Sequence, residues 1–77
     1  MRTFKVLGTG CSSCRTLLER VEMAASELDE PFVVEKVTDI ADILAHDVAA
    51  TPALMVDGEV RLAGRVPALD EVRELLR

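Results

Sequence analysis

Short apolar segments of two different periods follow one another along the chain, and their order limits the folds that the chain can adopt. Apolar residues alternate or run continuously in four segments that predict strands, and they recur at helical spacing in three others. The predicted strands are Arg2–Leu7, Phe32–Val37, Ala53–Val56 and Glu59–Ala63, and the predicted helices cover about 12–28, 40–48 and 69–76. The predicted order is therefore β-α-β-α-β-β-α.

The residues between these segments indicate how the strands pair. A helix joins the first two predicted strands, which requires parallel pairing with a right-handed crossover. Asp57-Gly58 is a strong two-residue hairpin signal, so the last two strands should be antiparallel. We expect Thr38 or Asp39 to cap the second helix, and Pro52 to stop that helical segment. These signals predict an α/β fold with a four-stranded mixed sheet flanked by helices.

Charge and composition disfavour several classes of function. The chain has 14 acidic and 9 scattered basic residues, a net charge of −5, which argues against nucleic acid as a partner. No apolar run approaches the ~20 residues that span a membrane, and the N-terminal apolar stretch is too short for a signal peptide. We therefore expect a cytoplasmic protein without a membrane partner. Residues 1–77 should form one small domain with an aliphatic core, because Phe4 and Phe32 are the only aromatic residues.

The two cysteines, Cys11 and Cys14, are separated by two residues. A disulfide that closes so short a loop would stabilise the fold by only about 2 kcal/mol, so structural reinforcement explains the pair poorly. The spacing alone leaves open a redox dithiol, half of a metal site or a structural bridge. Their position between the first predicted strand and helix favours redox chemistry. A helix start stabilises negative charge there, and the thiolate is the attacking form of a cysteine.

This position also suggests different roles for the two thiols. Cys11, at the helix start, would attack a substrate disulfide, and Cys14, one turn further and more buried, would resolve the mixed disulfide. Ser12 and Ser13 offer hydroxyl donors that could reach the Cys11 sulfur. Arg15, an exposed surface residue in the simplest interpretation, could add positive potential near it.

The chain resembles the thioredoxin superfamily, and more narrowly its very small thioredoxin-like members. The resemblance covers essentially the whole chain, through Gly8–Cys14, Thr51–Leu54, Val56–Glu59, Gly64–Pro67 and the final helix. It implies a thioredoxin-like fold of minimal length with a cis Thr51–Pro52 bond that lies against the dithiol. The backbone of Thr51 would pair with an extended substrate segment. Expected substrate-binding residues are Gly10, Ser12, Thr51 and Pro52.

The activity that the resemblance implies is that of a protein-disulfide oxidoreductase. Cys11 and Cys14 would be its catalytic residues, and it would use neither a cofactor nor a metal. Its partners would be a disulfide-containing protein and an electron donor, either a reductase or another thioredoxin, and such small domains are usually monomeric. Larger thioredoxins keep a buried acidic residue where this chain has Lys5, and alternation does not decide whether Lys5 is buried.

Two other functions would use the same cysteines. A carrier of a soft metal such as Cu(I) could bind through two thiolates, whereas His46, the sole histidine, is expected at the surface. Small ferredoxin-like metallochaperones also place Cys-x-x-Cys between strand and helix, but their order ends β-α-β. The predicted hairpin and final helix, together with Thr51-Pro52, argue against that family. The alternative of a regulatory interaction module whose dithiol senses the redox state also stays open.

Overall fold

The computed structural model describes residues 1–10 and 12–77. Its elements are β1 (Arg2–Leu7), α1 (Ser12–Ser26), β2 (Phe32–Val37), α2 (Ile40–Ala45), β3 (Ala53–Val56), β4 (Glu59–Ala63) and α3 (Leu69–Leu75). The strands form one sheet in the order β2-β1-β3-β4. β1 is parallel to β2 and antiparallel to β3, and β3 is antiparallel to β4. The predicted α/β fold with a mixed four-stranded sheet is confirmed.

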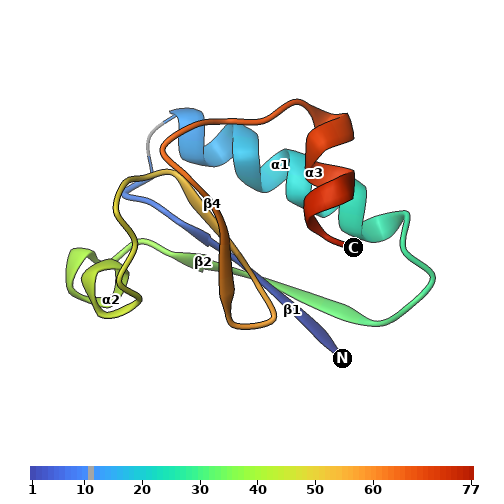
Figure 1. Cartoon of the computed structure of the whole chain (residues 1–77), viewed down its shortest axis with the longest axis horizontal. Coiled ribbons are helices and arrows are strands. Elements are labelled where there is room, and N and C mark those ends of the chain that lie inside the picture. Colours follow the sequence, from blue (N-terminus) through green and yellow to red (C-terminus); the bar gives the residue numbers. More distant parts are fainter. Residues whose placement is uncertain (11) are drawn as a thin grey trace.

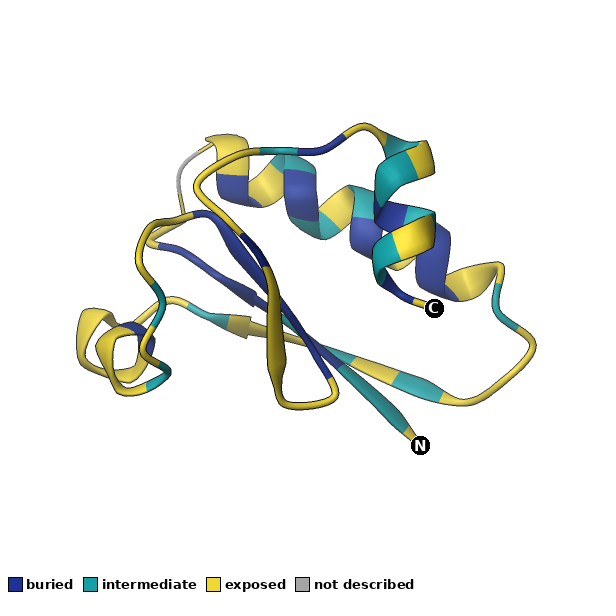
Figure 2. Cartoon of the chain, in the orientation of Figure 1, coloured by how far each residue is buried: buried dark blue, intermediate teal, exposed yellow. Residues whose placement is uncertain are grey.

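Helices cover both faces of this sheet (Figure 1). α1 and α3 pack on one face over the larger core cluster, to which β1 contributes Phe4 and Val6. α2 lies against the other face, where Ile43 joins a smaller cluster with Leu7 and residues of β3. This division follows from the alternation of side chains along a strand. Figure 2 shows the buried residues gathered along β1, β3 and the inner side of α1.

Local chemistry sets the ends of the helices. Asp39 is the N-cap of α2, and its carboxylate accepts the N–H two residues further on at 2.8 Å. α2 ends at Ala45, before the predicted residue 48, because Asp47 adopts a left-handed conformation with φ of 60° that stops a helix. Val48 still packs on the smaller cluster, which explains why it matched the helical period. α1 likewise ends at Ser26 and not at residue 28.

The turn between β3 and β4 is held by its own first residue. Asp57 and Gly58 have φ values of 49° and 89°, the positive values that a two-residue hairpin turn requires. The Asp57 carboxylate accepts the backbone N–H of Thr3 at 2.9 Å and the Nε–H of Arg2 at 2.8 Å. Both bonds lower the pKa of the Asp57 carboxyl below its ordinary value, and the bond from the Thr3 N–H has the larger effect. The hairpin is thereby tied to the start of β1.

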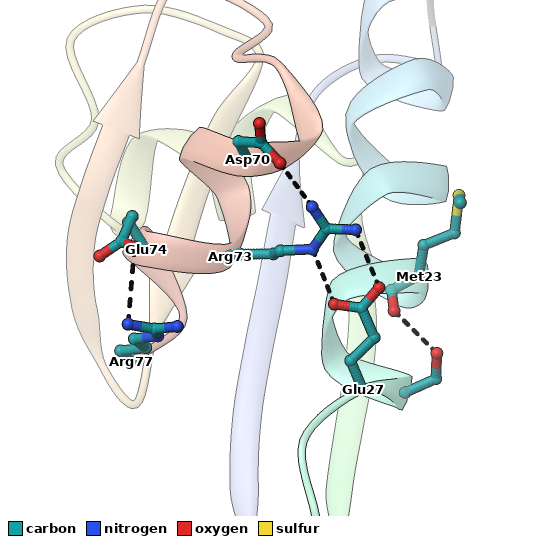
Figure 3. A network of polar contacts seen from close by, with 7 residues as sticks. Met23, Glu27, Asp70, Arg73, Glu74 and Arg77 are labelled. Atoms are coloured by element: carbon teal, nitrogen blue, oxygen red, sulfur yellow. Dashed lines mark hydrogen bonds and ion pairs between the residues drawn. The ribbon is translucent and has the colours of Figure 1, made fainter.

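Exposed ion pairs, which Figure 3 draws, and buried apolar residues together attach α3 to α1. Arg73 of α3 donates to both carboxylate oxygens of Glu27, at 2.7 and 3.0 Å, and also contacts Asp70 in its own helix. Exposed pairs of this kind add little to stability. The attachment depends mainly on Val72 and Leu76, which are fully buried in the larger core cluster. In the described part of the chain, no helix is long and apolar enough to cross a membrane.

Candidate functional site

Three connections meet at one end of the sheet, where β1 leads into α1. Leu7 pairs with Ala53 in antiparallel register, so the next residues, Gly8 and Pro52, lie across from each other just beyond the pairing. The N–H of Gly64, which follows β4, donates to the carbonyl of Pro52 at 2.9 Å. Figure 1 shows residues 8–10, which follow β1, the segment before β3 and the segment after β4 together at this end.

Cys14 lies in the first turn of α1 and points its sulfur at the backbone of Gly8. The residue is buried, with 6% of its surface exposed. A Cβ atom on Gly8 would lie 2.0 Å from the Cys14 Sγ and 3.1 Å from its Cβ, so only glycine leaves room for this sulfur. The Gly8 N–H donates to the carbonyl of Val37 at 2.9 Å, which holds the backbone in this place. Gly8 is therefore a positioning residue that the sequence interpretation did not single out.

The structure places the predicted substrate-binding residues around this contact. Gly10 is exposed, with φ of 89°, and Ser12 is exposed at the first position of α1. Thr51 is exposed, Pro52 is buried, and the bond between them is cis. Cys11, the predicted attacking residue, lies outside the described residues.

A pocket of about 100 Å³ opens beside Cys14, toward β2. Its described lining comes from β1, the turn after it, the start of α1 and the end of β2: Val6, Gly8, Gly10, Cys14, Arg15, Leu18, Lys36 and Thr38. Thr51 and Pro52 are not among these residues. Two basic side chains, Arg15 and Lys36, therefore stand at the rim of a pocket that reaches a cysteine.

Two other residues that the sequence raised as candidates lie elsewhere. Lys5 is neither fully buried nor fully exposed, and it alternates with Phe4 and Val6, so it lies on the sheet face that α2 covers. It does not share the face on which α1 carries Cys14. The Nδ1 of His46 lies 2.7 Å from a carbonyl oxygen of its own helix. Within residues 1–10 and 12–77, no three or more His, Cys, Asp or Glu residues are grouped so that they could hold a metal ion.

A mixed sheet in the order β2-β1-β3-β4, with a cysteine in the first turn of α1 and a cis-proline before β3, defines a thioredoxin-like domain. Residues 2–77 match the thioredoxin domain family. A thioredoxin of Methanothermobacter thermautotrophicus is 34% identical over 76 residues, which cover 99% of each chain. A thioredoxin of Methanocaldococcus jannaschii is 34% identical over 77 residues, all of this chain and 88% of that one.

The chain therefore belongs to the thioredoxin domain family, and the resemblance inferred from its sequence is confirmed. This relationship supports a function of the thiol–disulfide oxidoreductase type.

Proposed function

We propose that the protein is a thiol–disulfide oxidoreductase in which Cys11 and Cys14 exchange electrons with disulfides of other proteins. The observation that carries this proposal is the placement of Cys14 in a chain of the thioredoxin domain family. Its sulfur is buried against Gly8 and is poorly accessible to a protein-sized disulfide. It is suited instead to attack a mixed disulfide formed close by, and the residue three positions earlier is the other cysteine.

The proposed reaction has two displacement steps and transfers two electrons. The Cys11 thiolate attacks one sulfur of the substrate disulfide, so a Cys11–substrate disulfide forms and the first substrate thiolate leaves and takes a proton from water. The Cys14 thiol then loses its proton and attacks the Cys11 sulfur. This second step releases the other substrate thiol and leaves a Cys11–Cys14 disulfide. A reductase or another thioredoxin returns the two electrons, so the cycle needs no bound cofactor.

The end of the sheet around Gly8 and Pro52 is the proposed docking site for the substrate. Thr51 is exposed and directly precedes β3, so its backbone groups are available to pair with an extended segment of the substrate. Gly10 and Ser12 are exposed where β1 leads into α1. A disulfide held between these residues would lie next to the start of α1, where the proposed nucleophile follows Gly10 in the chain.

The proposed location of the protein in the cell follows from this chemistry. A protein that reduces disulfides suits the cytoplasm, where other thioredoxins and glutathione keep thiols reduced. We further propose that residues 1–77 act as one domain and as a monomer.

Trapping the mixed disulfide tests the proposal. Each of Cys11→Ser, Cys14→Ser and the double variant is incubated with a disulfide-bonded protein, and adducts are counted by mass, because the chain has neither Trp nor Tyr for fluorescence. We expect a stable adduct with Cys14→Ser, almost none with Cys11→Ser and none with the double variant. Equal trapping by both single variants would contradict the roles. If the wild-type protein forms no intramolecular disulfide after treatment with an oxidant, the metal-carrier alternative is favoured.

A further inference from the structure

The pocket beside Cys14 adjoins the docking site proposed for protein substrates and shares Gly8 and Gly10 with it, but its lining does not include Thr51 or Pro52. Its floor is apolar, because Val6 has only 3% of its surface exposed and Leu18 is half-buried against the larger core cluster. Its rim carries Arg15 and Lys36, both exposed. A volume of about 100 Å³ suits a small molecule and not a folded segment of another protein. The pocket thus combines a short apolar surface, a sulfur atom and two cations.

The two cations at the rim differ from most others in the chain. Five of the nine basic residues form ion pairs: Arg2, Arg61, Arg65, Arg73 and Arg77. Arg20 instead donates to the carbonyl of Pro67 at 2.6 Å. Lys5, Arg15 and Lys36 are the basic residues whose side chains have no ion-pair or hydrogen-bond partner among the described residues. Two of these three line the same pocket, although the net charge of the chain is −5.

The pocket exists because an apolar row on β2 ends in a lysine. Phe32, Val34 and Lys36 point to the same face of the sheet, and the first two pack against the larger core cluster. Lys36 is in register with Val6, where a third apolar residue would fill the space beneath the first turn of α1. β2 is an edge strand, on which lysine also hinders pairing with other chains. That role, however, does not require a second cation, Arg15, at the same pocket.

We infer that this pocket binds a carboxylate on a short apolar or sulfur-containing chain, which describes small acidic thiols and their disulfides. The carboxylate would lie between Arg15 and Lys36, where charge-assisted hydrogen bonds are strongest, and the chain would lie on Val6 and Leu18. The reactive part of this inference rests on the proposed function. One small disulfide would take two electrons from the reduced dithiol, so that one protein disulfide and two small thiols form.

Charge selectivity tests this inference. The reduced protein is mixed with 3,3′-dithiodipropionate, with neutral 2-hydroxyethyl disulfide or with cationic cystamine, and the loss of thiols is followed by alkylation and mass. We expect Arg15→Gln and Lys36→Gln each to lower the ratio of the anionic to the neutral rate by about threefold, and the double variant by about tenfold. A substitution that changes only the reactivity of the dithiol alters both rates alike, so its effect cancels in this ratio. Arg61→Gln is the matched control, since it removes one charge at the opposite edge of the sheet.

A binding measurement keeps the inference separate from the redox chemistry. Backbone amide shifts in the reduced protein are recorded with propionate and with neutral propionamide. We expect saturable shifts at Gly10, Arg15, Lys36 and Thr38 with propionate alone. Shifts that are spread over all basic residues, unchanged rate ratios in the variants, or binding of an acidic peptide but not of propionate would each overturn the inference. If no disulfide oxidises the dithiol but propionate binds, the proposed function fails and the carboxylate site stands.

Discussion

The backbone of Gly8 passes so close to Cys14 that a methyl group there would lie 2.0 Å from the sulfur. Gly8 is not in a left-handed conformation, unlike Gly10, Gly58 and Gly64, whose φ values are all near 90°. The requirement for glycine at this position is therefore steric and comes from the sulfur atom. At the scale of single residues, the site depends on the absence of a side chain at Gly8 as much as on the thiol of Cys14.

Gly8→Ala should therefore destabilise the protein through its contact with Cys14. We expect the free energy of unfolding to fall by about 1–3 kcal/mol, as for other overpacked interiors. In a Cys14→Ala background the cost should be clearly smaller, since the sulfur that the new methyl group meets is gone. The coupling is measured by urea unfolding of the wild type, Gly8→Ala, Cys14→Ala and the double variant. Unfolding is followed by far-UV circular dichroism under reducing conditions. An equal cost in both backgrounds would show that the Gly8 backbone, and not the sulfur, sets the requirement.

Asp57 provides a pH-dependent contribution to stability. The pKa of its carboxyl is lowered in the folded protein, first by the Thr3 N–H and then by Arg2. A lowered folded-state pKa means that the carboxylate stabilises the fold above its ordinary pKa of 3.8, and that this contribution is lost as the pH falls through the lower, folded-state value. Asp57→Asn keeps a residue that tolerates the left-handed turn but removes the charge.

We expect Asp57→Asn to lower the free energy of unfolding at pH 7, and the difference from the wild type to shrink progressively below pH 3.8. The ion pairs of Glu27 and Glu71 are present in both proteins, so their own pH dependence cancels in the comparison. Urea unfolding at a series of pH values measures the difference. A difference that does not change with pH would indicate that the variant disturbs the turn and not the charge.

The three helices are attached to the sheet to very different degrees. α1 has 15 residues, of which five are buried, whereas α2 has six residues, of which only Ile43 is buried. Ile40 and Leu44 of α2 have 63% and 67% of their surface exposed. α3 is short, but Val72 and Leu76 bury it in the larger core cluster. The layer that carries Cys14 is thus the firmly packed one, and the opposite layer is held by few contacts.

Hydrogen exchange should separate these elements. We expect the amides of α2 to exchange faster than those of α1, because a helix with one buried residue opens at lower free energy than a helix with five. Ile43→Ala should speed exchange in α2 with little effect on α1, whereas Val21→Ala, in the larger core cluster, should speed exchange throughout the chain. Amide exchange followed by NMR resolves the elements. Equal protection of α1 and α2 in the wild type would contradict this expectation.

At the scale of the whole molecule, the chain has the compactness that is typical of a domain of its length. Its radius of gyration is 11.2 Å, close to the roughly 11.5 Å expected for a compact domain of 77 residues. We expect small-angle scattering to give a radius slightly above this Cα value, since side chains and bound water also scatter. That radius should not change with concentration, because the protein is proposed to be a monomer. The core of this small domain is mostly aliphatic, with Phe4 fully buried in the larger core cluster and Phe32 packed against it. A radius that rises with concentration would contradict the monomer.

The amino-acid sequence by itself determined the features that depend on neighbours along the chain. The apolar periods predicted all seven elements, Asp57-Gly58 predicted the hairpin, and Asp39 was one of two expected caps. The cysteine spacing, together with the segment Thr51-Pro52, led to the thioredoxin family. Each of these signals lies within one continuous stretch of the chain, so it can be interpreted without knowing how the elements pack.

Only the tertiary structure decided the contacts between residues that are far apart. The sheet register placed Pro52 across from Gly8, and the packing of α1 brought the Cys14 sulfur onto that glycine. The same packing set Arg15 beside Lys36 at the rim of one pocket and left Lys5 on the opposite face. Such distances depend on strand register and on how a helix lies across a sheet, and no local period encodes either of them.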